Sequence, residues 1–506
     1  MKKEFEEKMK YVLGIDLGTS AVKVILVNQN GEIKAEATRH YPLLHPSPGF
    51  SEQNVEDWVI GTVESIKEII DSGVVHAIDI EGMSFSGQMH GLVLVDEQGK
   101  SLRPAILWND TRTTAQCEAI TESLGEKLLD ITQNKALEGF TLPKILWVKE
   151  HEPEIFAKAV HFLLPKDYLR YRLTGVIDME YSDAAGTLLF DVSKYEWSKE
   201  ICETFNLPKS ICPPVIESIG LSGTLLPEMA TQTGLNLDMK VFAGGADNAC
   251  GALGAGIVDD DVAMCSIGTS GVFLAHEASA DADYRGALHF FNHSKPESFY
   301  LMGVTLAAGH SLNWFKSTFA PDKSFDQLLA QVGSIAPGSN GLLFTPYIVG
   351  ERTPYADALI RGSFIGMDTT HTLDHFARAV LEGITFSLRD SLELMRSVGK
   401  KDIAQIISIG GGAKNEDWLQ MQADIFNATV IKLTSEQGPA LGAAMIAAVG
   451  CEWFTTFEAC KETFIACEKE FTPIPSHVKA YEKIYKIYTQ VYEQTKGLNQ
   501  ELHELR

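Results

Sequence analysis

A single carboxylate lies in the middle of a glycine-rich stretch. The segment "GGADNACGALGAG" at residues 244–256 holds five glycines, and its one acid is Asp247. Glycine-rich loops that bind phosphate usually carry a lysine, and this one has none. Asp247 follows an apolar run and precedes small residues that can form a helix, so the helix dipole would favour its ionised form. The residues alone leave two roles open, a helix cap and a general base aimed at a hydroxyl group.

A Gly-Thr-Ser turn occurs twice, each time between two apolar runs typical of strands. The segment "VLGIDLGTSAVKVIL" at 12–26 aligns with "AMCSIGTSGVFLAH" at 263–276. Such a turn exposes backbone amides and hydroxyls that can hold phosphate oxygens without a lysine, although an ordinary hairpin is the alternative. Asp16 ends the first strand of the first copy, where it could hold Mg²⁺ directly or through water. The predicted phosphate-binding residues are Thr19 and Ser20 in the first copy and Gly268 and Thr269 in the second.

A third glycine cluster joins a predicted strand to a predicted helix. In "IISIGGGAKNEDWLQMQADIF" at 406–426, the apolar run ends in three glycines and the helix begins near Asn415. A glycine turn that leads into a helix N-terminus is a natural site for an anion or a nucleotide. A tight strand-to-helix connection without a ligand is the alternative.

A polar segment closes another predicted strand. The segment "SFSGQMHG" at 84–91 places Gln88, Met89 and His90 between two glycines. Polar groups beside an apolar one suit a polyhydroxylated ligand, although a lone histidine is often a hydrogen-bonded structural residue. The sequence therefore predicts a sugar or polyol contact here as one of two interpretations.

The elements that must position these residues alternate between short apolar runs and longer amphipathic ones, which is typical of α/β proteins. A strand is predicted at 11–18, two more follow with a turn at Asn30, a helix covers 55–70, and a strand covers 76–87. The small residues at 438–448 predict a helix packed closely on a neighbour, and the tail at 476–506 predicts a long helix. The repeated opening favours two duplicated domains that face each other.

Composition excludes several classes of function. The chain of 506 residues has 43 basic and 67 acidic side chains and a formal charge of −24, which disfavours binding to nucleic acid or to anionic membranes. Eight scattered cysteines without a CxxC pair are expected to be reduced. No Walker motif, dinucleotide fingerprint, nucleophile elbow or zinc spacing occurs, and neither a signal peptide nor a membrane span is expected. A cytoplasmic protein is the prediction.

Two long segments resemble the signatures of a known family. The segment "GFTLPKILWVKEH" at 139–151 and the segment "GSFIGMDTTHTLDHFARAVLE" at 362–382 are similar to those of the FGGY carbohydrate kinases. The resemblance implies two duplicated actin-like ATPase (ribonuclease H-like) α/β domains about a central cleft. It further implies a sugar-binding domain at 1–254 and a nucleotide-binding domain with a C-terminal helix at 255–506.

The resemblance also assigns roles to residues. Asp247 matches the catalytic base of the family, and Asp16 matches its magnesium carboxylate. The implied cofactors are ATP and Mg²⁺. The residues that match sugar contacts are Gln88, Met89, His90, Asp247 and Asn248, and those that match nucleotide contacts are Thr19, Ser20, Gly268, Thr269, Gly309, Gly412 and Asn415.

Segments such as "GQMHG", "SDAAGT" and "GERTP" most resemble members that phosphorylate D-xylulose. The implied reaction converts ATP and D-xylulose to ADP and D-xylulose 5-phosphate. Another substrate such as ribulose, a deoxy-ketose or gluconate stays open. A non-catalytic sugar sensor of the same fold would be expected to lack the acid that Asp247 supplies. The expected partners are a small sugar and ATP, without nucleic acid or membrane, and a homodimer is compatible with the resemblance.

Overall fold

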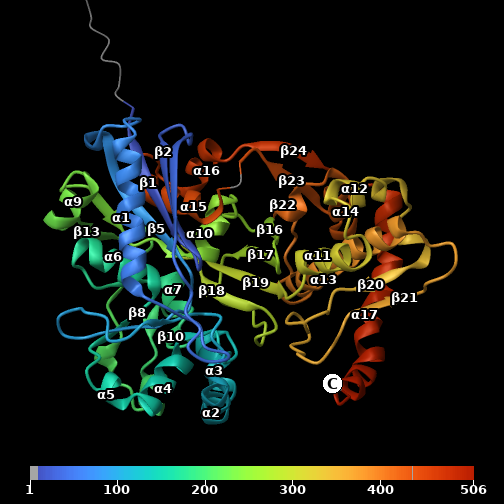
Figure 1. Ribbon diagram of the computed structural model, residues 1–506, viewed down its shortest axis with the longest axis horizontal. Coiled ribbons are helices and arrows are strands. Elements are labelled where there is room, and N and C mark those ends of the chain that lie inside the picture. Colours follow the sequence, from blue (N-terminus) through green and yellow to red (C-terminus); the bar gives the residue numbers. More distant parts are fainter. Residues whose placement is uncertain (1–8, 436, 506) are drawn as a thin grey trace, which may run out of the picture.

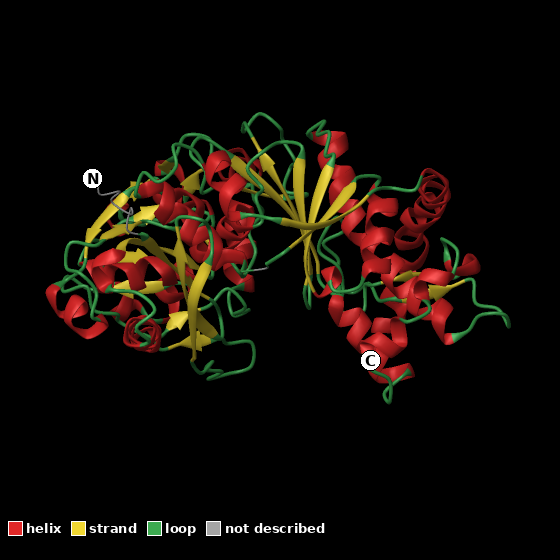
Figure 2. Cartoon of the chain, turned by 90° about the horizontal axis from the view of Figure 1, so that it is seen from above, coloured by secondary structure: helices red, strands yellow, loops and turns green. Residues whose placement is uncertain are grey.

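The computed structural model describes residues 9–435 and 437–505, and two seven-stranded sheets form its two halves. Figure 1 shows the N-terminal half on the left and most of the C-terminal half on the right. Seen from above in Figure 2, the strands of the second half fan out between helices on either side. The predicted fold of two α/β domains is confirmed.

The first sheet has the strand order β13-β14-β5-β1-β2-β3, with β15 also paired to β5. β1, β2 and β3 are antiparallel, and β1 is parallel to β5. The strands are β1 Tyr11–Leu17, β2 Ala21–Asn28, β3 Ile33–His40, β5 Ile80–Gly87, β13 Leu221–Thr224, β14 Lys240–Phe242 and β15 Gly245–Ala246.

The second sheet has the order β18-β19-β17-β16-β22-β23-β24. Its antiparallel trio β16, β17 and β19 corresponds to β1, β2 and β3, and its parallel strands β22 and β23 correspond to β5 and β14. An antiparallel strand, β13 or β24, follows in each sheet, so the predicted duplication is confirmed. The strands are β16 Val262–Ile267, β17 Gly271–Glu277, β18 His289–Asn292, β19 Phe299–Thr305, β22 Gln405–Gly410, β23 Thr429–Leu433 and β24 Cys467–Phe471.

Helices cover both faces of the first sheet. Helix α1 (Val55–Asp71) begins after Asn54, whose side chain accepts a hydrogen bond from the amide of Glu56 as an N-cap. It lies on β2 and β3 beside α9 (Pro227–Thr233) and α6 (Pro165–Thr174). The opposite face carries α15 (Gly438–Gly450), which packs on β1 and β5 although it follows a strand of the second sheet.

Helix α15 and helix α10 (Asp247–Gly254) pack with their backbones almost in contact. A Cβ atom added to Gly442 would lie 1.9 Å from the carbonyl oxygen of Cys250, and one added to Gly254 would lie 2.2 Å from that of Gly438. Only glycine permits this approach. The closely packed helix predicted at 438–448 is therefore confirmed.

The second sheet is covered by α13 (Leu373–Val398) and α14 (Glu416–Phe426), while α11 (Gly309–Phe319) packs on α13 and α17 (Pro475–His503) packs on α14. Helix α17 confirms the predicted C-terminal helix, and it buries Tyr481, Tyr488 and Val491. One prediction differs at its edge: the strand expected at 76–87 begins at Ile80, because residues 77–79 form a 3₁₀ turn.

No helix of residues 9–435 and 437–505 combines the length and the apolar character that crossing a bilayer requires.

The remaining elements are short. The other helices are α2 Thr114–Leu124, α3 Glu126–Thr132, α4 Thr141–His151, α5 Pro153–Phe156, α7 Tyr181–Ala185, α8 Lys199–Thr204, α12 Phe325–Leu329 and α16 Phe457–Phe464. The other strands are β4 Glu52–Gln53, β6 Val93–Val95, β7 Ala105–Ile106, β8 His161–Leu163, β9 Met179–Glu180, β10 Phe190–Asp191, β11 Glu196–Trp197, β12 Val215–Ile216, β20 Leu343–Thr345 and β21 Ser363–Ile365.

Candidate active site

Two cavities meet at the second Gly-Thr-Ser turn. The larger one, of about 350 Å³, lies between the two halves and is lined by Asp247 and by Ser270 of the turn. The smaller one, of about 310 Å³, is lined by Gly268 and Thr269 of the same turn. The two cavities therefore share this turn, and it would contact ligands bound in both.

Asp247 is the first residue of α10 and lies in the wall of the larger cavity. Its Oδ1 atom accepts hydrogen bonds from the backbone amide of Asn248 at 2.7 Å and from the side-chain amide of Asn248 at 3.1 Å. The N-cap position belongs to Ala246, and no side chain caps this helix. Burial, and then the neighbouring charge of Asp16, raise the pKa of Asp247 to about 7. A carboxylate with that pKa suits a general base near neutral pH.

The glycines around Asp247 serve close packing. Gly244 has a φ of +86°, and a Cβ there would lie 2.2 Å from the carbonyl oxygen of Phe85. A Cβ on Gly245 would lie 2.1 Å from Oγ of Ser294. The segment thus needs glycine to pass between β5 and the second half of the chain. This explains why a glycine-rich stretch without lysine surrounds a carboxylate.

The larger cavity brings Met89, His90 and Asn248 beside Asp247, as the sequence predicted for them. The Sδ atom of Met89 accepts a weak hydrogen bond from Nδ2 of Asn248 at 3.5 Å. His90 has a φ of 67°, and its Nδ1 lies 2.6 Å from the carbonyl oxygen of Gly186. Because a carbonyl can only accept, Nδ1 carries the proton and Nε2 is free to accept.

His289 is a second histidine of this cavity, and sequence analysis missed it. Its Nδ1 lies 3.0 Å from Oδ1 of Asn134, and the side-chain amide of Asn134 donates to the carbonyl of Phe290 at 2.8 Å. Because the Asn134 oxygen can only accept, Nδ1 of His289 carries the proton, as Nδ1 does in His90. Burial lowers the pKa of both histidines to about 3, so both rings are neutral at pH 7. Two neutral imidazoles can accept hydrogen bonds from hydroxyl groups.

Arg352 lines the same cavity, and it too was missed. The backbone around it is tied to β19, since Thr353 donates its amide to the carbonyl of Val304 at 3.0 Å and accepts the amide of Val304 on its hydroxyl at 3.0 Å. Burial lowers the pKa of Arg352, and the charges of Glu138 and Glu351 oppose that effect. The cavity therefore contains a cation as well as neutral hydrogen-bonding groups.

Gln88 lies beside the first turn and is not among the residues that line the larger cavity. Its side-chain amide donates to Gln53 at 3.1 Å and to the carbonyl of Gly18 at 3.5 Å. Gln88 follows Gly87, the last residue of β5, and its backbone amide donates to the carbonyl of Leu17 at 2.9 Å. The structure thus places Gln88 beside the first turn, and its predicted contact with the sugar stays a prediction.

The first turn is held by side chains from several elements. Trp108, which lines the larger cavity, donates its indole N–H to Oγ1 of Thr19 at 2.9 Å. Gln53 donates to the carbonyl of Thr19 at 2.5 Å, and the hydroxyl of Tyr41 donates to the carbonyl of Gly18. Ser20 is exposed at the tip of the turn.

The smaller cavity contains Gly268, Thr269, Gly309 and Asn415, four of the predicted nucleotide contacts. Gly309 begins α11 and donates its amide to the carbonyl of Gly268 at 2.9 Å, which brings a helix N-terminus to the turn. The residues that sequence analysis missed here include Asn313, Phe325, Asp326, Gly411, Lys414 and Trp418.

Gly412 differs from the prediction. Gly411 lines the smaller cavity, whereas Gly412 is buried and a Cβ on it would lie 2.6 Å from Ile267. Asn415 caps α14 by accepting the amide of Trp418 at 2.9 Å, so its oxygen is already engaged. Spacing alone could not separate glycines that face the cavity from glycines that face the core.

Asp16 is the second-last residue of β1 and is the candidate ligand for a divalent ion. Its Oδ1 atom is buried without a hydrogen-bond partner within the described part of the chain. Burial raises the pKa of Asp16, and its charge in turn raises the pKa of Asp247. Two carboxylates that repel each other fit a bound Mg²⁺, which prefers one or two carboxylates and keeps several waters. Within residues 9–435 and 437–505, no group of three or more His, Cys, Asp or Glu side chains is placed to hold a metal ion.

These features define the class of the protein. Two duplicated halves with the strand pattern described above, a carboxylate at the cavity between them and two phosphate-type turns belong to the actin-like ATPase fold. Models of the FGGY family of carbohydrate kinases match the chain at residues 11–254, as the N-terminal domain, and at 263–451, as the C-terminal domain. The chain belongs to this family and is a carbohydrate kinase, and membership implies ATP as its phosphoryl donor.

The proteins that are similar to this chain include a xylulose kinase and a gluconate kinase. The chain is 59% identical to the xylulose kinase of Bacillus subtilis strain 168 over 498 residues, which cover 98% of this chain and 100% of that protein. The crystal structure of a xyloylose kinase from Brucella ovis is similar with a TM-score of 0.90 and 33% identity, and the match covers 97% of this chain and 100% of that one. A gluconate kinase from Lactobacillus acidophilus is similar with a TM-score of 0.91, 25% identity and coverage of 96% and 98%.

Proposed function

We propose that the protein transfers the γ-phosphoryl group of ATP to the 5-hydroxyl of D-xylulose and thereby forms D-xylulose 5-phosphate. The observation that carries the choice of sugar is the full-length 59% identity with the xylulose kinase of Bacillus subtilis. The cavity beside Asp247 agrees in character, since it combines neutral acceptors with apolar and aromatic walls.

Asp247 is the proposed general base. It accepts the proton of the 5-hydroxyl as that oxygen attacks phosphorus, and Asn248 keeps its Oδ1 atom oriented. The free Nε2 atoms of His90 and His289 accept hydrogen bonds from other hydroxyls of the open-chain sugar. Met89 packs against its carbon chain. Because the transition state of phosphoryl transfer is loose, such positioning carries much of the rate enhancement.

ATP is proposed to occupy the smaller cavity, with its phosphates directed between the two Gly-Thr-Ser turns. Thr269 provides its amide and hydroxyl at the second turn, against which Gly309 packs, and Thr19 and Ser20 provide donors at the first. Asp16 would hold Mg²⁺ there, and when bound this ion neutralises the developing negative charge. We assign sugar binding to residues 1–254 and nucleotide binding to 255–506. The cytoplasmic location and the homodimer stay predictions.

A sugar acid is the second candidate substrate. The observation that favours it is Arg352, a cation in the wall of the larger cavity, together with the likeness to a gluconate kinase. A neutral ketopentose does not need a guanidinium group, whereas a carboxylate would pair with it.

One assay separates these substrates. ADP release is measured with D-xylulose, D-ribulose, glycerol and D-gluconate at fixed ATP and Mg²⁺. We expect the highest kcat/KM for D-xylulose. A preference of about tenfold or more for gluconate or glycerol would overturn the assignment of the sugar and leave the kinase assignment intact.

A further inference from the structure

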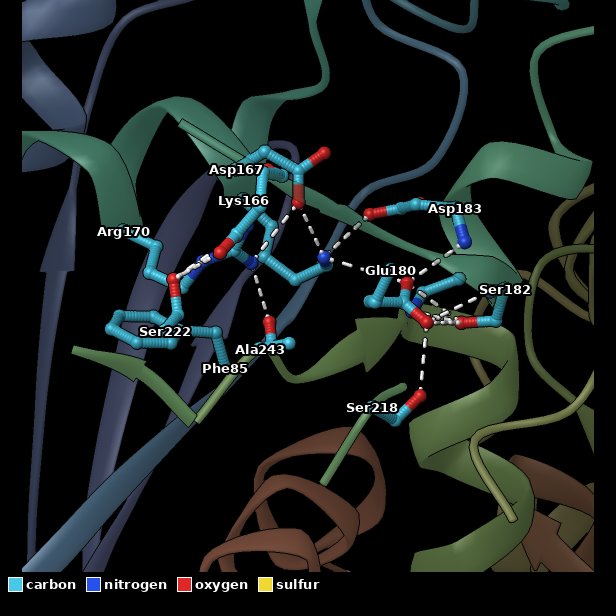
Figure 3. Close-up of polar contacts among 12 residues, drawn as sticks. Phe85, Lys166, Asp167, Arg170, Glu180, Ser182, Asp183, Ser218, Ser222 and Ala243 are labelled. Atoms are coloured by element: carbon cyan, nitrogen blue, oxygen red, sulfur yellow. Dashed lines mark hydrogen bonds and ion pairs between the residues drawn. The ribbon is translucent and has the colours of Figure 1, made fainter. Parts of the chain in front are cut away.

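A buried network of charged side chains lies behind the cavity wall that carries Asp247. Lys166, Asp167 and Arg170 of α6 have no exposed surface, and neither do Glu180 and Asp183. Figure 3 shows Asp167, Glu180 and Asp183 around the amino group of Lys166, with Arg170 near Ala243. None of these five side chains has a role in the proposed phosphoryl transfer, so their burial needs a separate explanation.

The network holds the backbone that leads to Asp247. Arg170 donates to the carbonyl of Ala243 at 2.5 Å, and the amide of Gly244 donates to the carbonyl of Ser218 at 3.0 Å. The amide of Ala246, which is the residue before Asp247, donates to Oγ of Ser182 at 2.9 Å. The approach to Asp247 is thus held at successive points.

Glu180 connects these points. Its Oε2 atom accepts the hydroxyl of Ser182 at 2.8 Å and the hydroxyl of Ser218 at 2.9 Å (Figure 3). Its Oε1 atom accepts the amide of Asp183 at 2.8 Å and lies 3.5 Å from Nζ of Lys166. One carboxylate therefore orients both serines that adjoin the Asp247 segment.

The direction of the Ser182 hydroxyl matters. A carboxylate can only accept, so the Ser182 proton points at Glu180 and an oxygen lone pair is left for the amide of Ala246. Burial would lower the pKa of Lys166, but the charges of Asp167, Asp183 and Glu180 raise it, so the network keeps its cation. Both oxygens of Glu180 accept hydrogen bonds, and this fixes the direction of the Ser182 hydroxyl.

We infer that Glu180, acting through the hydroxyl of Ser182, is a positioning residue that aims the Asp247 carboxylate at the acceptor hydroxyl of the sugar. The inference rests on the proposed role of Asp247 as the base. It assigns to the "SDAAGT" segment a task in the reaction, although none of the atoms concerned touches a substrate.

Ser182→Ala tests the inference, with Ser218→Ala as its matched control. Each variant removes one buried hydroxyl from the same oxygen of Glu180, but only Ser182 also accepts the amide next to Asp247. We expect kcat to fall about tenfold or more in Ser182→Ala and to stay within about twofold in Ser218→Ala, with KM for ATP unchanged in both, because misorientation of a catalytic group lowers the rate. Thermal midpoints measured on the same preparations report loss of folding separately.

Asp247→Asn supplies the background that distinguishes the two proposals. If Ser182 acts through Asp247, then Ser182→Ala lowers kcat much less in the Asp247→Asn background than in the wild-type protein. An equal fall of kcat in Ser182→Ala and Ser218→Ala, or an undiminished effect in the Asp247→Asn background, would overturn the positioning role. Wild-type turnover of Asp247→Asn alone would instead overturn the proposed base.

Discussion

The two Gly-Thr-Ser turns have the same residues and each joins two antiparallel strands, yet they are built differently. The first turn is held by the side chains of Tyr41, Gln53, Gln88 and Trp108. The second is held by the backbone amides of α11, since the amide of residue 310 donates to the carbonyl of Thr269 at 3.0 Å and that of residue 309 to Gly268. Side chains fix one turn, and a helix N-terminus fixes the other.

Their chemistry differs as well. Asp16 is the second-last residue of the strand before the first turn, and Ser266 occupies the equivalent position before the second. Both carboxylates discussed above, Asp16 and Asp247, belong to the first half of the chain. The two halves thus share a scaffold and divide the chemistry: both carboxylates lie in the first half, whereas the residues that line the smaller cavity lie in the second.

The strongest test of this division is Asp247→Asn. The amide keeps the shape of the side chain but cannot take up a proton at neutral pH, so kcat should fall by about 10²–10⁴. ATP affinity should stay unchanged, because Asp247 is not among the proposed nucleotide contacts. Kinetics and a nucleotide-binding titration on the same preparation check both parts. Turnover within about threefold of wild type would show that Asp247 is not the base.

The next test substitutes alanine for the equivalent residue before each of the two turns. Asp16→Ala removes the carboxylate proposed to hold Mg²⁺, and we expect kcat to fall by about 10–100-fold with a raised requirement for Mg²⁺. Ser266→Ala is the matched change at the second turn, and it should leave kcat within about twofold. Similar losses in both variants would contradict the division of work. The measurement is ADP release across a Mg²⁺ titration.

The acid limb of the pH profile is the third test. Burial and the charge of Asp16 raise the pKa of Asp247 to about 7, and the base must be ionised to act. As pH falls below that pKa the ionised fraction decreases, so kcat/KM for the sugar should fall by about tenfold per unit of pH. His90 and His289, whose pKa values are about 3, should add no further step near pH 6. A profile flat from about pH 5 to 8 would contradict this assignment.

The smallest expected effect concerns the second turn. A methyl group added by Gly309→Ala would lie 2.3 Å from the carbonyl oxygen of Gly268 and would force the turn to move. KM for ATP should rise several-fold while KM for the sugar stays the same, since only the nucleotide cavity is disturbed. Gly497→Ala, where nothing lies within 4 Å of the added atom, is the control in α17. An equal rise of both KM values would mean that the turn serves both halves alike.

Much of the fold and part of the site follow from the sequence, because their signals are local. Apolar strands, the repeated turn, the cap at Asn54 and the small residues of α15 each depend on neighbours in the chain. Asp247 could be singled out because a lone acid among glycines is unusual, and Asp16 because it ends a strand beside a turn. The family resemblance then supplied roles for these positions.

Tertiary structure alone decided which other residues line the larger cavity. His289 and Arg352 line it from an edge strand and a loop of the second half, far along the chain from Met89 and His90. A single histidine or arginine without a spacing pattern carries no sequence signal of this. Gln88 hydrogen-bonds beside the first turn although it adjoins Met89, and core packing buried Gly412 beside Gly411. A pattern in the chain determines which elements form and where they turn, whereas the side of an element that faces a cavity depends on what packs against it, and that partner is chosen only when distant segments meet.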